Sequence, residues 1–320
     1  MILAELPPNW LRLGAVLLGL VWGSFLNVVV CRLPRGMSIV RPASHCPACG
    51  EPIGARDNIP LLSFLLLRGR ARCCGAAISA RYPLIEALGG VLSLAVLEAL
   101  VLPLGPATPA LEAMAVYLAN LALALGLVAA AFIDLEHMVL PDSITLGGTA
   151  LGLLTFSVRG VPLGDALLGA ALGYVAVWLP FCAIYPLLRG QAGMGLGDAK
   201  LLMLAGAWLG WSGAVLVLAL GAIQGSVAAA LLLLARGRID EPDSVRRERE
   251  RAWAQIESLP AAERPEAERE LLRDPLALPP ARGWAKARIA FGPFIILATL
   301  ECLLLGPGRI IHWLLTAGFG

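Results

Sequence analysis

Two acidic sites in an otherwise apolar chain are the residues best placed to do chemistry. Asp134 follows one apolar stretch, and Asp198 precedes another within the segment Gly-Met-Gly-Leu-Gly-Asp-Ala-Lys at residues 193–200. Ionisable groups at membrane depth are costly and are therefore functional candidates. Two close carboxylates share one proton because both cannot comfortably ionise. The ionised group could deprotonate water while the protonated group polarises a carbonyl, so this pair could hydrolyse a peptide bond without a metal.

Each aspartate also has a plainer interpretation. Asp198 could be a helix N-cap, since Asp is favoured there, and Asp134 could be a helix-end charge at the level of the lipid headgroups. Gly195 and Gly197 would allow a close backbone approach and unusual dihedral angles before Asp198. We favour the catalytic pair because neighbouring residues could support it, namely Pro141, Asp142 and Lys200.

The elements that must position this pair are membrane helices. The chain has 320 residues, of which 58% are hydrophobic and 15% are charged, and apolar runs near the length needed to cross a bilayer recur along it. Backbone groups in lipid must be satisfied within a segment. The sequence therefore predicts an all-α polytopic membrane protein with about eight transmembrane helices, at 11–31, 84–104, 113–133, 143–159, 164–187, 200–213, 214–234 and 289–315.

Charge divides the chain into five parts and sets its orientation. The segment 32–83 holds eight arginines against Glu51 and Asp57, which predicts a cytoplasmic loop domain by the positive-inside rule. It separates a retained first helix (1–31) from a transmembrane core (84–235). A charged cytoplasmic insertion (236–288), expected to form short solvated helices at 244–256 and 263–273 as a surface feature, precedes the last helix (289–320). Alternation places both aspartates at the cytoplasmic face, and we expect no binding of nucleic acid because no basic stripe with aromatic residues is present.

The ordered motifs resemble those of the bacterial type IV prepilin peptidase family, the leader peptidase/N-methyltransferases. The GxGD motif matches Gly195–Asp198, and Asp134 stands in an I-D-x-x-x-x-x-L-P-D stretch. The resemblance extends to the segments 23–29, 32–34, 58–61, 81–86 and 291–294. It implies an inner-membrane endopeptidase, with Asp134 and Asp198 catalytic, that removes the leader of type IV prepilins or type II secretion pseudopilins. It also implies methylation of the new N-terminus with S-adenosylmethionine.

Cysteines in the loop domain are similar to the family's zinc-binding pair of C-x-x-C motifs. Cys46 and Cys49 form a good first half. The second half departs from the pattern, because Ala71 stands where the first cysteine is expected and Cys73 directly precedes Cys74. Adjacent cysteines can bind one metal only with a distorted backbone, so we expect Cys46, Cys49 and Cys74 to be better structural zinc ligands than Cys73. No segment has the signature of a Rossmann site. The resemblance associates methyl transfer with the cytoplasmic N-terminal region, which makes Gly69 and the cysteine loop candidates for the S-adenosylmethionine site.

Three other functions remain open at this stage. A peptidase that has lost methylation would fit the altered cysteine pattern. A proton-coupled transporter would place its acids near the bilayer midplane, whereas an inactive scaffold for pilus assembly would tolerate loss of either aspartate. The sequence predicts contact with a lipid bilayer and with prepilin or pseudopilin substrates, and it leaves the oligomeric state undetermined.

Overall fold

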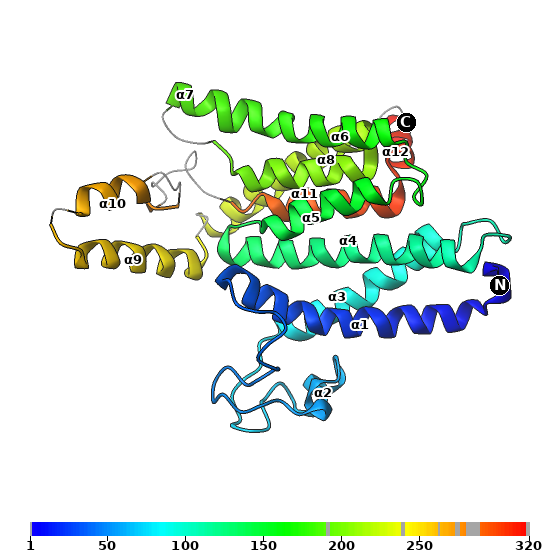
Figure 1. The fold of residues 1–320 in the computed structure, drawn as a ribbon, viewed down its shortest axis with the longest axis horizontal. Helices are drawn as coiled ribbons and strands as arrows, with labels where there is room; N and C mark the ends of the chain where they lie inside the picture. The colour runs from blue at the N-terminus through cyan, green and yellow to red at the C-terminus, as the bar shows by residue number, and fades with distance from the viewer. Residues whose placement is uncertain are drawn as a thin grey trace.

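The fold is a bundle of long apolar helices; the charged insertion projects from one end, and the cysteine-containing loop domain lies at the side of the N-terminal helices (Figure 1). The structure is a computed structural model, and it describes residues 2–189, 193–237, 241–261, 263–272, 276–279 and 289–317. Apart from isolated β-bridges, every regular element in these ranges is helical, which confirms the predicted all-α class. The longer elements are α1 (Pro8–Arg32), α3 (Arg81–Val96), α4 (Ala110–His137), α5 (Asp142–Leu154), α6 (Leu163–Val177), α8 (Leu196–Arg236), α9 (Asp243–Ser258), α11 (Gly292–Leu305) and α12 (Pro307–Ala317).

Shorter elements complete the bundle and the loop domain. They are η1 (Leu3–Glu5), η2 (Leu33–Arg35), η3 (Ala55–Asn58), α2 (Leu62–Leu66), the π-helical segments η4 (Leu97–Val101) and η5 (Trp178–Ile184), α7 (Tyr185–Arg189) and α10 (Arg264–Leu271). Proline marks where many helices begin: it occupies the residue just before α4, α5, α6 and α9, and it is the first residue of α1 and α12. Its fixed φ and missing N–H suit these positions and no interior ones.

Helix α4 is the centre of the bundle. It contributes to both hydrophobic clusters, one formed with α1 and α3 and the other with α6, α8 and α11. In the most apolar stretch of α4, 72% of the residues are buried, whereas in that of α8 only 22% are buried. Large side chains of α8 such as Val215 and Ile223 are therefore exposed. Because the outer helices present apolar side chains outward, the bundle suits a lipid environment.

Small residues let the helices approach closely. Gly23 on α1 lies against α3, where an added Cβ would be 2.8 Å from the Glu86 Cα atom, and Gly206 on α8 faces Gly169 on α6 in the same way. Such contacts stabilise membrane bundles because lipid offers helices no hydrophobic drive to associate.

Each expected apolar segment falls on a helix, but the boundaries differ. Among the described residues, five helices are singly long and apolar enough to cross a membrane, or six if the pair α11–α12, bent by 96°, is one span. The expected single last helix is thus bent at Gly306. The segment expected at 143–159 forms a helix of only 13 residues, α5. The break expected at 213–214 occurs at Gly210, where φ is 73°.

Gly210 reverses the chain within α8. Gly225 faces Phe291, and Gly292 lies beside Asp134, which is close to Asp198. Residues before and after Gly210 therefore return to the same end of the bundle. A positive φ with an extended ψ is open to glycine and not to residues with a side chain, so this residue permits the turn.

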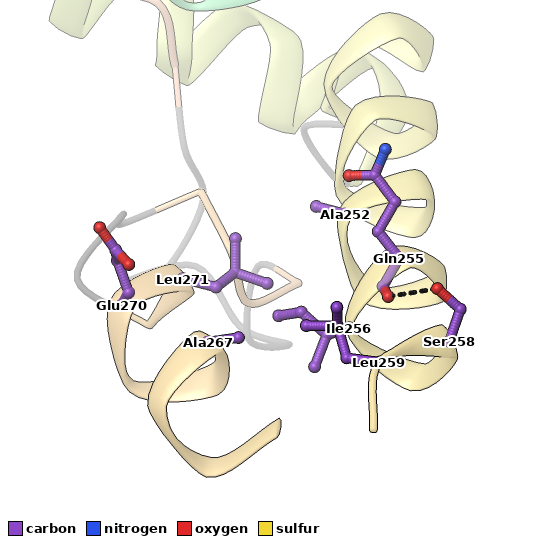
Figure 2. A pocket seen from close by; sticks show the side chains of 8 residues that line it. All are labelled: Ala252, Gln255, Ile256, Ser258, Leu259, Ala267, Glu270 and Leu271. Carbon is purple, nitrogen blue, oxygen red and sulfur yellow. Dashed lines mark hydrogen bonds between the residues drawn. The ribbon is translucent and has the colours of Figure 1, made fainter. Parts of the chain in front are cut away.

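The charged insertion forms two helices, as predicted, although Arg273 and residues 280–288 lie outside the described residues. The sequence did not show that α9 packs on α4. The Ser244 hydroxyl donates to the Glu136 carbonyl, and Glu248 contacts His137 Nδ1 at 3.2 Å. Between α9 and α10, Ile256, Leu259 and Leu271 face a common cavity (Figure 2). The insertion is thus attached to the helix that carries Asp134.

Candidate functional site

Asp134 is buried in the last turn of α4. Its side chain is 5% exposed, and its Oδ2 atom has no hydrogen-bond partner among the described residues. The helix ends three residues later at His137, where Met138 adopts a left-handed conformation and its N–H bonds back to the Asp134 carbonyl. Asp134 is therefore not the exposed helix-end charge of the plainer interpretation, because a carboxylate at headgroup level would be solvated.

Asp198 lies in the first turn of α8 and is not its N-cap. The N-cap is Gly195, and the Asp198 carboxylate interacts with the Gly195 backbone N–H. Neither Gly195 nor Gly197 has a positive φ, so the expected unusual dihedrals are not observed. The approach of substrate to these glycines stays a prediction, and within the protein a Cβ added at Gly197 would lie 3.0 Å from Leu140 Cβ.

The two carboxylates meet at one end of the bundle. Asp134 and Asp198 are near enough to interact electrostatically, although they come from different helices and are 64 positions apart in the chain. Leu140 packs beside both, since it contacts the backbone of Gly197 and of Gly292. The Gly292 backbone in turn lies against Asp134, where an added Cβ would be 2.5 Å from Oδ2. The start of α11 therefore forms a third wall of this site.

Sequence reasoning missed Gly292 and Leu140 as parts of this site. Gly292 belongs to the Phe-Gly-Pro-Phe segment 291–294 that contributed to the family resemblance, which was the available signal. Its position against Asp134 depends on how α11 packs on α4 and could not be seen from spacing.

The supporting residues also come together. Lys200 Nζ lies 2.6 Å from Asp142 Oδ1, which joins the first turns of α8 and α5. Pro141 is the residue just before α5. This ion pair connects the segment after Asp134 to the helix that holds Asp198, so it fixes the register between the two halves of the site.

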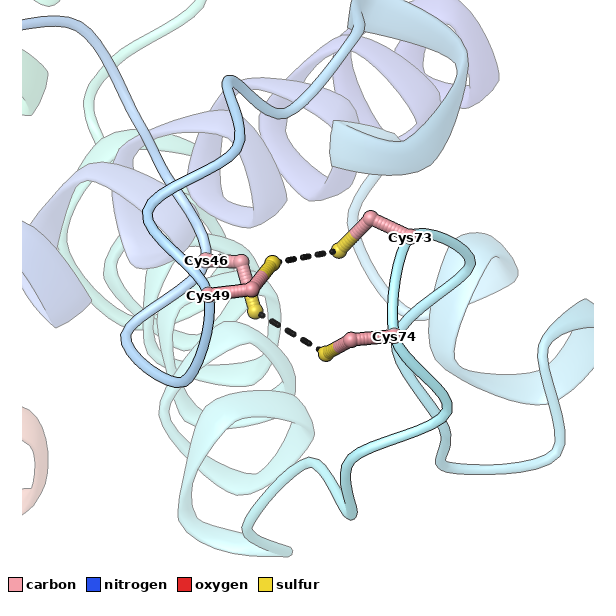
Figure 3. A group of neighbouring side chains, drawn as sticks. All are labelled: Cys46, Cys49, Cys73 and Cys74. Atoms are coloured by element: carbon pink, nitrogen blue, oxygen red, sulfur yellow. Dashed lines mark hydrogen bonds between the residues drawn. The ribbon is translucent and has the colours of Figure 1, made fainter.

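Four cysteines form a second cluster, in the loop domain (Figure 3). Cys46 Sγ lies 3.7 Å from Cys74 Sγ, Cys49 Sγ lies 3.3 Å from Cys73 Sγ, and all four sulfur atoms are within 4.8 Å of one another. Tetrahedral zinc with Zn–S bonds of about 2.3 Å needs sulfur atoms about 3.8 Å apart. The observed spacing fits a four-thiolate metal site.

The two halves of this cluster are matching turns. In the first, the Gly50 N–H bonds to the Cys46 carbonyl at 2.8 Å, and in the second the Gly75 N–H bonds to the Ala71 carbonyl at 2.8 Å. Isolated bridges flank them at His45–Pro52 and Arg70–Ala77. Ala71 therefore occupies the place that Cys46 holds in the first turn. Cys73, which the sequence favours less than the other three, reaches the cluster from inside the second turn.

The thiols differ in acidity. Backbone N–H groups of Cys49 and Ala48 lower the pKa of Cys46 to about 6. A hydrogen bond with Cys49, together with burial, raises the pKa of Cys73 to about 12. Neighbouring thiols do not readily lose several protons together, because the resulting thiolates repel one another. A bound divalent cation would offset this repulsion, since its ligands are thiolates.

Gly69 has a structural explanation. Its φ is 69°, its N–H bonds to the Phe64 carbonyl at 2.9 Å, and an added Cβ would lie 3.3 Å from Phe64 Cζ. Glycine is favoured at such a left-handed position after a helix. The assignment of Gly69 to the S-adenosylmethionine site stays a prediction.

The fold and these two clusters define a class of protein: a multi-pass helical membrane protein with a carboxylate pair at one bundle end and a cysteine domain beside it. The sequence matches the family models described as "Bacterial Peptidase A24 N-terminal domain" over residues 17–100 and "Type IV leader peptidase family" over residues 121–230. The chain belongs to the type IV leader peptidase family.

Three relatives named prepilin leader peptidase/N-methyltransferase illustrate the similarity. The protein of Aeromonas salmonicida (strain A449) is 44% identical, covering 71% of this chain and 83% of the relative. That of Myxococcus xanthus (strain DK1622) is 39% identical over 91% and 89%, and that of Neisseria gonorrhoeae is 40% identical over 74% and 87%. No solved structure matches the chain.

Proposed function

We propose that this protein is an inner-membrane aspartyl endopeptidase that removes the leader of prepilins or pseudopilins and then methylates the new N-terminus. The observation that carries the proposal is the meeting of Asp134 and Asp198 from separate helices of a family whose relatives are named for this activity. Helix ends at the charged end of the bundle suit a site at the cytoplasmic face. A proton-transporting function would instead favour acids at mid-helix.

In the proposed reaction, the ionised member of the pair takes a proton from water, whose oxygen adds to the peptide carbonyl carbon. The protonated member donates a hydrogen bond to the carbonyl oxygen as negative charge develops there. The intermediate collapses with cleavage of the C–N bond, and the leaving amine takes up a proton. The buried Oδ2 of Asp134, which has no hydrogen-bond partner among the described residues, is the kind of oxygen that this role requires.

We further propose that the cysteine cluster holds a structural zinc ion through Cys46, Cys49, Cys73 and Cys74. The spacing of the sulfur atoms supports this assignment. The bound ion would cross-link two turns of a loop domain that has little hydrophobic core. Methyl transfer to the new amine would use S-adenosylmethionine, in keeping with the N-methyltransferase names of the relatives.

The test is the mass of a client pilin co-expressed with this protein. Wild-type protein should yield a pilin that has lost its leader and gained one methyl group. Asp134→Asn and Asp198→Asn should each leave the leader in place, because each carboxylate has a separate role. Asp165→Asn is the matched control, since this exposed acid lies near Gly210, at the opposite end of the bundle. Substantial cleavage by either active-site variant would contradict the assignment.

A further inference from the structure

A basic cavity lies where the charged insertion meets the helical bundle. It has a volume of about 300 Å³ and joins η2, which directly follows α1, the end of α4 and one face of α9. Six side chains line it: Arg35, His137, Ser244, Arg247, Glu248 and Arg251. Three guanidinium groups therefore face a single carboxylate, so the cavity carries net positive charge without any contribution from the histidine.

The single acid is already in use. Glu248 Oε1 lies 3.2 Å from His137 Nδ1. The His137 side chain is 5% exposed, so this contact forms part of the cavity wall.

The arginines of α9 divide into two sets. Arg246 pairs with Asp243 at 2.7 Å, and Arg249 pairs with Glu241. Arg247 and Arg251 are four residues apart, so they share one helical face. Both are exposed, and neither has an ion-pair partner in the described part of the chain. The unpaired set is the one that lines the cavity.

The position of the cavity identifies the chemistry it would meet. Arg35 follows the membrane-spanning helix α1 within three residues, and His137 ends the membrane-spanning helix α4. Basic residues just beyond the ends of membrane helices meet the phosphate groups of anionic lipids. Guanidinium groups bind the oxygens of phosphate through paired hydrogen bonds, and the cavity volume is sufficient for a phosphate with its first attached atoms.

We propose that this cavity binds a phosphate group, supplied by the headgroup of an anionic phospholipid. The phosphate oxygens would accept hydrogen bonds from Arg247, Arg251 and Arg35. Because the ligand contacts α9 together with the ends of α1 and α4, it would hold the charged insertion against the helix that carries Asp134. This proposal does not depend on the peptidase activity.

The test measures lipid retained by the purified full-length protein in nanodiscs. Discs contain phosphatidylcholine alone or with phosphatidylglycerol, and lipids that remain bound are counted by native mass spectrometry. Wild-type protein should retain phosphatidylglycerol and show a higher thermal midpoint in the discs that contain it. Arg247→Gln combined with Arg251→Gln should weaken retention roughly tenfold or more, because two charge contacts to the headgroup are lost.

Two controls make the result decisive. Arg264→Gln combined with Arg269→Gln removes the same charge from α10, whose arginines do not line the cavity, and should retain lipid as wild type does. Inorganic phosphate, titrated into discs of phosphatidylcholine, tests the free anion. If inorganic phosphate alone stabilises the wild-type protein but not the Arg247→Gln, Arg251→Gln variant, the site binds free phosphate in place of a lipid headgroup. Equal retention in the two double variants, or none in wild type, would overturn the proposal.

Discussion

Cys73 provides the sharpest test of the metal site, because sequence and structure disagree about it. In the structure its sulfur lies 3.3 Å from Cys49 Sγ and belongs to a group of four within 4.8 Å. A tetrahedral site needs edges of about 3.8 Å, so shifts of up to about an ångström would complete it. We therefore expect purified wild-type protein to contain one chelator-resistant zinc ion per chain.

Replacing Cys73 by alanine should strongly lower the affinity of this site for zinc without abolishing zinc binding. Structural zinc contributes about 10–16 kcal/mol in four-ligand peptides. An equal share for each ligand is on the order of 3 kcal/mol, which corresponds to roughly a hundredfold in affinity. Cys73→Ala should thus lose zinc to a chelator that wild type resists, whereas Cys31→Ala, which removes a cysteine outside the cluster, should keep it.

The matching turns offer a rescue. Ala71 occupies the place of Cys46 in the second turn, so Ala71→Cys in the Cys73→Ala protein should restore a four-cysteine site. Zinc content before and after dialysis against a chelator, with the thermal midpoint of the same samples, measures both effects. Full chelator-resistant zinc in Cys73→Ala would refute the assignment of Cys73, and absence of zinc from every variant would refute the metal site itself. Cleavage should change little, because the aspartates lie on other elements.

Three further predictions concern the carboxylate site and the orientation of the chain. Gly292→Ala should reduce cleavage severely, because a Cβ there would lie 2.5 Å from Asp134 Oδ2. Gly147→Ala is the control, since Gly147 has open space around it. Equal cleavage by the two variants would show that α11 does not hold Asp134. Lys200→Met should lower the cleavage rate by up to about fivefold, since partly exposed ion pairs contribute about 0–1 kcal/mol, and an Asp142→Asn, Lys200→Met double variant should be no worse than either single one. Reporter fusions within 32–83 and after Ser258 should both report the cytoplasm, and a periplasmic signal from either would place the cysteine domain and the insertion on opposite sides.

Much of the architecture could be predicted because it depends on local composition. Lipid requires that backbone groups bond within a segment, so apolar runs become helices wherever they are long enough. Charge then identified both polar parts, and α9 and α10 formed where opposite charges alternate. The motif around Asp198 and the segment that begins at Asp134 also pointed to a shared site. Both lie at the ends of apolar runs, and the predicted orientation places these ends on the same side of the membrane.

Other features required tertiary structure because they depend on which helix faces which. The reversal at Gly210 returns α8 to the end where it started, and the bend at Gly306 divides the last helix. Neither change of direction alters the apolar pattern that identifies a span. Gly292 and Leu140 complete the carboxylate site only because α11 packs on α4 and on α8.

The sequence by itself determined the class of fold, the helices and the residue types available for chemistry. Tertiary structure decided which side chains and segments contact one another. Spacing suggested that Cys73 was the poorest ligand, yet the folded second turn directs its sulfur to the other three. Charge suggested a surface insertion, yet α9 contacts the end of α4 through Ser244 and Glu248. Both outcomes arise from contacts between segments distant in the chain, whose geometry depends on how turns and helix faces meet and not on any local pattern.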